Sequence, residues 1–412
     1  MWRHHDEKVV LATANYIGKL ECGIIRWPGE LYREAFRAIL SAPNDAALEF
    51  VNARSRRAAV RLEKVDRQSL LRGTAALGVG TFLLGPLMAL LEDLEDAEPE
   101  PTPTRVGATD IAQIRTVTRE LASWCARYGS GGLVRDTVMT SLRSSARLLG
   151  AHCPGHLRAE LHSAVGDLAE TAGQTALDAN AHGQARQVFR FALGCAEKAK
   201  DWPLRANVLD SMATQEIRTG QPDEALTLTE LALVRADDRL TATVQTMLHA
   251  TRARALAKMR RVNDALTAIG AAEDHFAHAT PADDPPHMAY FTTAFLAGNT
   301  GQALFDLALL GHHPERATDR FSTAVAEAAA GKVRTRTAWL TKLASLTMAT
   351  GDPLQAAIFG HEALDAADTI RSRRVTEVLR ELLRCAAPHQ HLTEVAHLRH
   401  RINTLLTGTD SR

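Results

Sequence analysis

The chain has 412 residues, and 48 Lys and Arg balance 48 Asp and Glu, so its formal net charge is zero. This balance excludes a globally basic surface of the kind that nucleic-acid-binding proteins show, and any basic footprint must be local. Hydrophobic residues make up 45% of the chain, which supports a large buried core and excludes global disorder. The five cysteines are widely spaced without a C-x-x-C pair, which disfavours disulfides and zinc and favours the reducing cytoplasm.

Residues 1–65 begin with two predicted short helices. The first covers residues 13–21 and ends near Gly23, and Pro28 opens the second, which continues to Leu40 with apolar residues at helical spacing. Basic side chains beside the first helix are suited to phosphate oxygens, and an Asn on it could contact a base edge. The candidate DNA-contacting residues are Asn15, Tyr16, Lys19 and Arg26. The alternative is a solvated helix face that contacts nothing.

Residues 66–108 contain an apolar segment followed by an acidic linker. Residues 73–91 form a run of 19 uncharged residues, which is nominally long enough to cross a bilayer. Because the run contains Pro86 and several glycines, a buried helix or a pair of short helices is the favoured interpretation, and a membrane span is the alternative. The acidic, proline-rich residues 92–103 cannot bury enough surface to order themselves, which indicates a linker.

Residues 109–412 carry a repeat of small residues. Alanines recur at spacings of 40, 40, 52 and 39 residues, and each is followed seven residues later by another alanine. The first alanines of the series are Ala185, Ala225, Ala265, Ala317 and Ala356. A fixed period in a helical sequence indicates stacked helix pairs, and small residues at these positions let neighbouring helices approach closely.

The repeat predicts five helix hairpins whose second helices begin near residues 184, 223, 263, 315 and 354. Gly220 and Gly351 precede two of these helices, where a left-handed residue would end the first helix. Asp223 and Asp352 are placed as N-caps or first-turn acids. The small-residue pattern resembles the tetratricopeptide repeat, which implies an all-α, right-handed α-solenoid. A plain helical bundle is the alternative.

The same register places a set of polar side chains on the inner face of the first helices, acidic ones early and basic ones in the middle. This face would form a groove for a peptide, a small ligand or a partner protein, although any solvated helix face is also polar. The predicted groove residues are Asp167, Glu170, Gln174, Asn207, Asp210, Arg218, Arg254, Lys258, Asn299, Gln302 and Asp306.

Catalytic motifs are not found in the sequence. The 17 histidines form no H-E-x-x-H arrangement, and no hydrolase or phosphate-loop signature is present. The densest group, His389, His391, His397 and His400, lacks a carboxylate or cysteine to complete a metal site. We therefore predict a protein that is not an enzyme and has no metal or cofactor.

The order of segments resembles a known family. Ile17, Leu20, Glu21, Gly23 and Pro28 match the pattern I-x-x-L-E-x-G followed by Pro, and DRQSLLRGTAALGVG, RYGSGGLVRDTVMTSLRSSARLLG and TAGQTALDANAHGQARQVFRFAL follow in order. This succession resembles actinobacterial XRE-type (λ-repressor-like) helix-turn-helix regulators with C-terminal tetratricopeptide sensors. Two helices that precede the recognition helix in that domain are missing, so the helix-turn-helix is partial: either the start lies upstream of Met1 or half of the domain has been lost.

The resemblance implies a cytoplasmic transcriptional regulator. Its sensor would bind a ligand or partner and modulate the N-terminal segment, with DNA as a second partner and a homodimer as a candidate form. The alternative is a scaffold for protein–protein interaction that no longer binds DNA. A membrane is not an expected partner.

Overall fold

The computed structural model describes residues 2–3, 9–10, 104–234, 239–329, 331–367 and 373–410. The chain divides into two compact units, Met1–Glu100 and Pro101–Arg412. In the first unit the described residues form two short antiparallel strands, β1 (Trp2–Arg3) and β2 (Val9–Val10). The candidate DNA-contacting residues Asn15, Tyr16, Lys19 and Arg26 lie outside the described residues, and so does the apolar segment 73–91.

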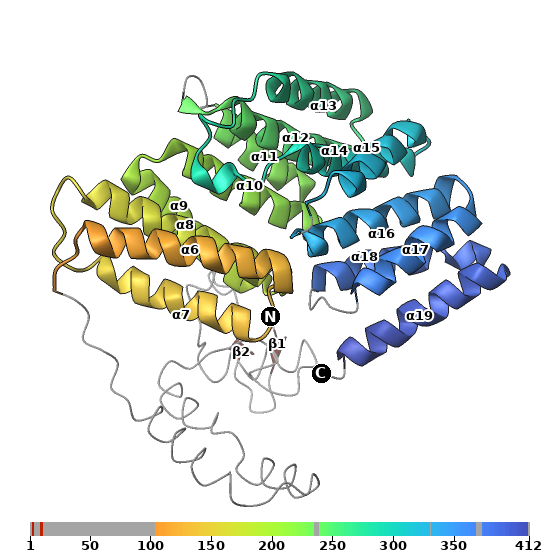
Figure 1. Cartoon of the computed structure of the whole chain (residues 1–412), viewed down its shortest axis with the longest axis horizontal. Coiled ribbons are helices and arrows are strands. Elements are labelled where there is room, and N and C mark those ends of the chain that lie inside the picture. Colours follow the sequence, from red (N-terminus) through yellow and green to blue (C-terminus); the bar gives the residue numbers. More distant parts are fainter. Residues whose placement is uncertain are drawn as a thin grey trace, which may run out of the picture. The chain divides into compact units, whose positions relative to one another are not determined.

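The second unit, called the helical unit below, is all-α, as the sequence predicts (Figure 1). Its described residues form fourteen α-helices and two short 3₁₀ helices. The α-helices are α6 (Ala108–Tyr128), α7 (Leu133–Leu148), α8 (Arg158–Asp178), α9 (His182–Ala199), α10 (Trp202–Arg218), α11 (Pro222–Leu233), α12 (Ala242–Lys258), α13 (Val262–Ala277), α14 (Thr293–Ala308), α15 (Pro314–Ala326), α16 (Val333–Thr350), α17 (Pro353–Ala367), α18 (Arg373–Cys385) and α19 (Thr393–Asp410). The 3₁₀ helices are η3 (Pro286–Met288) and η4 (Ala387–His389).

Consecutive helices pack in pairs, α8 with α9, α10 with α11, and so on to α16 with α17. The second helices of these five pairs begin at residues 182, 222, 262, 314 and 353, each within two residues of the predicted starts. Three of them begin with proline, whose missing N–H is unpaired in any first turn, so the proline favours a helix start there. The predicted helix pairs are confirmed.

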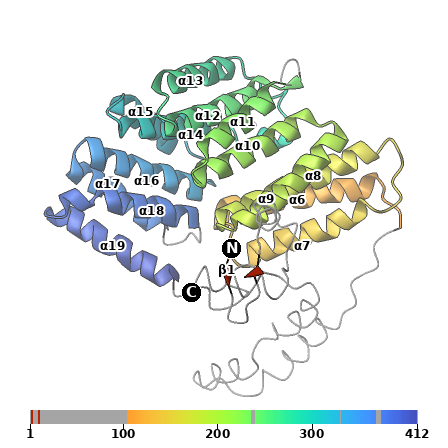
Figure 2. The ribbon, with the colours of Figure 1, turned by 180° about the vertical axis from the view of Figure 1, so that it is seen from behind.

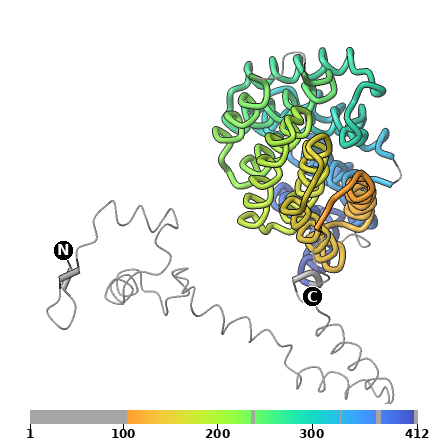
Figure 3. Tube along the Cα trace, turned by 90° about the vertical axis from the view of Figure 1, so that its left-hand side faces the viewer, coloured from red at the N-terminus to blue at the C-terminus, as the bar shows by residue number. Residues whose placement is uncertain are grey.

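The first helices of the pairs form a continuous layer, because each of α8, α10, α12, α14, α16 and α18 contacts the next. The helices α13, α15 and α17 lie at the outer edge of this layer in Figure 1, and Figure 3 shows the helical unit from the side. All five first alanines of the repeat are fully buried. They pack where a larger side chain would separate the helices, which explains the period in the sequence.

The layer curves until early and late helices meet. Helix α6 contacts α16, and Arg334 on α16 forms an ion pair with Asp178 on α8. Arg218 on α10 donates from Nη2 to Oε2 of Glu377 on α18 over 3.0 Å. Figures 1 and 2 show the starts of α16 and α18 beside the ends of α8 and α10 near the middle of the helical unit. Residues far apart in sequence therefore share one site.

The 52-residue spacing in the repeat arises from a long connection between α13 and α14, residues 278–292, which contains η3. The connection packs back on earlier helices. Asp284 accepts hydrogen bonds from the hydroxyls of Thr241 and Thr243, both over 2.6 Å, and the hydroxyl of Tyr290 donates to Sδ of Met247 over 3.3 Å. The extra residues are thus part of the packed structure.

The predicted helix ends are confirmed in part. Gly220 has a φ of 83° and is left-handed, as predicted. The prediction for Gly351 is wrong, because its φ is −134° and α16 ends without a left-handed residue. Several helices instead end in left-handed residues other than glycine, such as Asn180 and Lys200. Asp352 accepts a hydrogen bond from the N–H of Leu354 over 2.9 Å, as an N-terminal cap does.

Candidate functional site

The layer formed by the first helices of the pairs, called the inner layer below, carries two clusters of charged side chains. The first, called the acidic cluster, consists of Asp167 and Glu170 on α8 and Asp210 on α10. Glu170 is only 9% exposed and accepts a hydrogen bond from the Ser211 hydroxyl over 2.8 Å. Gln174 donates to the same hydroxyl over 2.7 Å. Burial raises the pKa of Glu170 to about 7, against the lowering effect of its hydrogen bonds to Ser211 and Gln174.

The pKa values of the two aspartates of the acidic cluster are raised as well. Burial raises the pKa of Asp210 to about 6, although a hydrogen bond with Thr251 and the charge of Arg254 oppose this. The Oδ1 atom of Asp210 is buried without a hydrogen-bond partner. Burial and then repulsion from Asp201 raise the pKa of Asp167 to about 6. These carboxylates can change protonation near neutral pH and can accept a hydrogen bond from a ligand.

The long connection reaches this cluster through Tyr290. Burial raises the pKa of the Tyr290 hydroxyl well above its ordinary value, and the negative charges of Asp210 and Glu170 raise it further. The ring of Tyr290 packs edge-on against Phe295, with centroids 5.1 Å apart. The Tyr290 phenol is therefore neutral and lies within the electrostatic influence of these two carboxylates.

The second cluster, called the arginine cluster, consists of Arg218 on α10, Arg254 on α12, Arg334 on α16 and Arg374 on α18. Arg218 lies where early and late helices meet. It donates to Oδ1 of Asn180 over 2.9 Å and to Oε2 of Glu377 over 3.0 Å. Asn180 in turn donates to Oε1 of Glu377 over 2.6 Å, so the three side chains form a closed set of hydrogen bonds.

Asp178 is, after Glu377, the second carboxylate that pairs with members of the arginine cluster. It is 6% exposed, forms an ion pair with Arg334, and has Oδ1 at 4.0 Å from Nη1 of Arg218. The Ser130 hydroxyl donates to its other oxygen over 3.1 Å. Nε of Arg334 is buried and has no hydrogen-bond partner. Burial, and then repulsion from Arg374, lowers the pKa of Arg334 to about 10.

The remaining two arginines of the cluster have long hydrogen bonds or none to the described residues. Arg254 is 8% exposed, and its Nη1 has only long hydrogen bonds to Thr214 and Asn299, over 3.4 and 3.5 Å. Arg374 makes no hydrogen bond or ion pair with any residue of the described ranges. The pKa of each is lowered to about 10, first by burial and then by a neighbouring arginine, Arg374 for Arg254 and Arg218 for Arg374.

The other predicted groove residues lie on the same helices. Lys258 on α12 donates to Asp306 on α14 over 2.7 Å. Asn299 accepts from Arg254, Asn207 is buried on α10, and Gln302 is half-buried on α14. The structure thus places all eleven predicted residues on the inner helices and brings five of them into the two clusters.

Four residues of the arginine cluster and its surroundings were missed by the sequence analysis: Asp178, Arg334, Arg374 and Glu377. They lie near helix ends, whereas the inner face was predicted from other positions of the first helices, counted from the repeated alanines. One signal was available, since Arg334 and Arg374 are one repeat period apart, each at the second position of a first helix.

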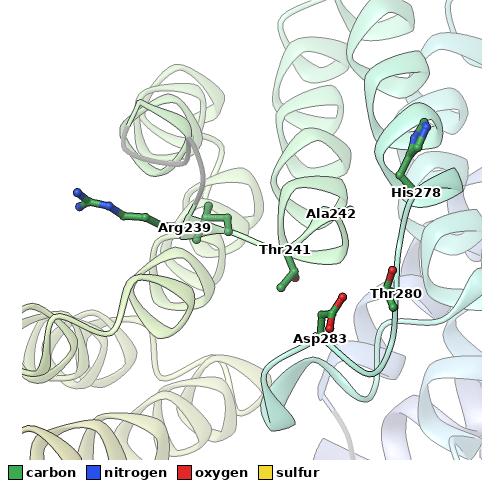
Figure 4. Close-up of a pocket in the computed structure, with 7 residues that line it drawn as sticks. Arg239, Thr241, Ala242, His278, Thr280 and Asp283 are labelled. Atoms are coloured by element: carbon green, nitrogen blue, oxygen red, sulfur yellow. The ribbon is translucent and has the colours of Figure 1, made fainter.

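Two open clefts elsewhere are weaker candidates. One, of about 280 Å³, lies between the start of α12 and the long connection, and in Figure 4 Thr241 and Asp283 face it while Arg239 points away. The second, of about 310 Å³, lies between α17 and α19 and is lined by Leu364, His400, Arg401, Thr404 and Leu405. Neither is lined by a buried polar atom that lacks a partner.

Within the ranges that the structure describes, no three His, Cys, Asp or Glu side chains are grouped closely enough to hold a metal ion. Among the helices so described, none combines the length and hydrophobicity needed to cross a bilayer. Neither a scan against protein-family models nor a search of the curated proteins finds a match for this chain.

Proposed function

We propose that the chain is a non-enzymatic regulatory protein. In this proposal the helical unit is a right-handed, tetratricopeptide-like α-solenoid whose inner face binds a peptide, a small ligand or a partner protein. The observation that supports it best is the incomplete pairing of buried charged groups on the inner helices. Asp210 and Arg334 each retain a buried atom without a partner, and the half-buried Arg374 makes no hydrogen bond or ion pair among the described residues. Unpartnered buried charges destabilise a fold, so a ligand that pairs with them would explain their presence.

The position of the arginine cluster suggests how binding could be transmitted. The cluster joins α8 and α10 to α16 and α18 through Asp178 and Glu377. A ligand that pairs with these groups would bind one curvature of the helical layer more tightly than another, and would shift the population of the two. The N-terminal segment, with Asn15, Tyr16, Lys19 and Arg26, would then bind DNA to a different extent.

Selection of bound fragments from sheared genomic DNA of the source organism tests the DNA-binding part. The full chain should enrich particular fragments, and Lys19→Ala with Arg26→Ala should weaken binding to every fragment and reduce its salt dependence, because phosphate contacts release counterions. Arg373→Ala, which removes an exposed charge of the helical unit, is the control. No enrichment, or equal enrichment by the double variant, would contradict the DNA-binding part.

A scaffold without DNA binding is the second candidate, and one observation favours it. Val117, Trp124 and Tyr128 share a face of α6 at helical spacing and are 40%, 43% and 56% exposed. Exposed aromatic side chains on one face are typical of protein–protein contact sites. Trp124→Ser with Tyr128→Ser should abolish the capture of partners by proximity labelling in cells, whereas Phe191→Ser, which alters an exposed aromatic on α9, should not. Unchanged capture would argue against the scaffold.

A further inference from the structure

The arginine cluster has more positive charge than its protein partners neutralise. Asp178 and Glu377 are the two carboxylates that pair with its members, and both contact Arg218. Asp306 is already paired with Lys258, and Asp210 is hydrogen-bonded to Thr251. Among the residues that the structure describes, Arg254 and Arg374 therefore form no ion pair, although the charges of Asp210 and Asp306 act on Arg254 and that of Glu377 acts on Arg374. Burial, and then repulsion from a neighbouring arginine, lowers the pKa values of Arg254, Arg334 and Arg374, and a bound anion would offset both effects.

The guanidinium groups come from different helices. Arg254 lies on α12, Arg334 on α16 and Arg374 on α18. A planar carboxylate has two oxygens and is satisfied by a single arginine fork, whereas a phosphate monoester presents three oxygens and carries nearly two negative charges at pH 7. Donors from several helices and an excess of more than one positive charge favour the phosphate.

The N-terminal ends of α16 and α18 also favour a bound anion. Arg334 and Arg374 each occupy the second position of their helices, and the starts of α16 and α18 lie near the middle of the helical unit (Figures 1 and 2). The first-turn N–H groups of an α-helix and its dipole attract anions. Here two such ends accompany the half-buried Arg334 and Arg374, which lack full pairing.

From these contacts we propose that the arginine cluster binds the phosphate monoester group of a small ligand, held by Arg254, Arg334 and Arg374. The inference rests on the proposed function, because it names the ligand chemistry of the same inner face. Arg218 is already bonded to Asn180 and Glu377, so it is not one of the three side chains that hold the phosphate.

Isothermal titration calorimetry of the full chain tests the proposal with glycerol phosphate, inorganic phosphate and acetate at matched ionic strength and pH 8. We expect saturable binding of both phosphates and none of acetate. Binding of inorganic phosphate as tight as that of glycerol phosphate would identify free phosphate as a sufficient ligand within the proposal. Acetate binding as tight as phosphate binding would overturn the proposal, and so would the absence of phosphate binding.

Arg374→Gln should weaken phosphate binding at least about tenfold, because a hydrogen bond to a charged group is lost. Arg373→Gln removes the same charge from the neighbouring exposed position and is the matched control. Arg334→Gln gives an independent second variant, and circular dichroism confirms that each variant is folded. Unchanged affinity in both Arg374→Gln and Arg334→Gln would overturn the proposal. DNA enrichment without phosphate binding would refute this inference alone, whereas phosphate binding without DNA enrichment would refute only the DNA-binding part of the proposed function.

Discussion

The acidic cluster and the arginine cluster lie on overlapping sets of inner helices, but different kinds of contact hold them. Glu170 is bonded by a neutral hydroxyl, Ser211, only 41 residues away on the next first helix. Arg218 is bonded by a carboxylate, Glu377, 159 residues away, and Asn180 contacts the same carboxylate across 197 residues. One cluster is built between neighbouring helix pairs, and the other joins opposite ends of the helical layer.

The difference follows from the chemistry of the two groups. A buried carboxylate can take up a proton, so neutral donors are enough and the pKa rises, as it does for Glu170. A guanidinium group stays charged at any physiological pH, so its burial requires an opposite charge. The arginine cluster therefore links distant helices through carboxylates, while the acidic cluster responds to pH.

The largest effect is expected from Asp178→Ala. This change removes the carboxylate between Arg218 and Arg334 and leaves both arginines buried with less compensation. Breaking a buried ion pair by removing one partner destabilises a protein by about 3–5 kcal/mol. Urea denaturation should show this loss in the free energy of unfolding. Asp319→Ala, at an exposed position on α15, is the control and should change stability by less than about 0.5 kcal/mol. Equal effects of the two changes would show that the arginine cluster does not join the helices.

A smaller effect on the free energy of unfolding, whose size depends on pH, is expected from Glu170→Gln. The folded pKa of Glu170 is raised from 4.5 to about 7, so between these values the folded state binds a proton that the unfolded state has released. The stability that this proton contributes is present below pH 4.5 and is lost as the pH rises to 7. The amide cannot ionise, so the variant should gain about 1–3 kcal/mol relative to the wild type between pH 4.5 and pH 8.

Denaturation of both proteins across this pH range measures the difference. Glu224→Gln, at an exposed position on α11, is the control and should show no such trend. A stability difference between Glu170→Gln and the wild type that does not change with pH would show that the acidic cluster is not protonated near neutrality.

The smallest effect is expected from Asn180→Gly. Asn180 is left-handed, with a φ of 57°, so glycine keeps the backbone conformation and removes only the side chain that bonds Glu377 and Arg218. The loss of these bonds should destabilise the protein by about 1 kcal/mol, because part of the set is solvated. Lys200→Gly at a left-handed, exposed helix end is the matched control. A thermal shift equal to that of the control would show that these long-range bonds contribute little.

The helix pairs could be predicted from the sequence because their determinants are local. A buried alanine such as Ala225, a helix-starting proline such as Pro222 and a left-handed Gly220 act within a few residues. The inner-face residues followed from the same register, which is why Glu170 and Asp210 were identified. Gly351 was misassigned because its φ of −134° and ψ of −137° are a conformation that no neighbouring residue signals.

The arginine cluster could not be predicted in the same way. The meeting of α8 and α10 with α16 and α18 is the sum of small rotations between successive helix pairs, each determined by side-chain packing over the whole interface. The long connection at residues 278–292 adds to this sum, because it packs on α12 through Asp284 and Tyr290. The sequence by itself determined the helices, their pairing and the polar inner face, since these depend on contacts close along the chain. Only the tertiary structure decided that Arg334 and Arg374 lie beside Asp178 and Arg218, because the curvature that joins them accumulates over the entire helical unit.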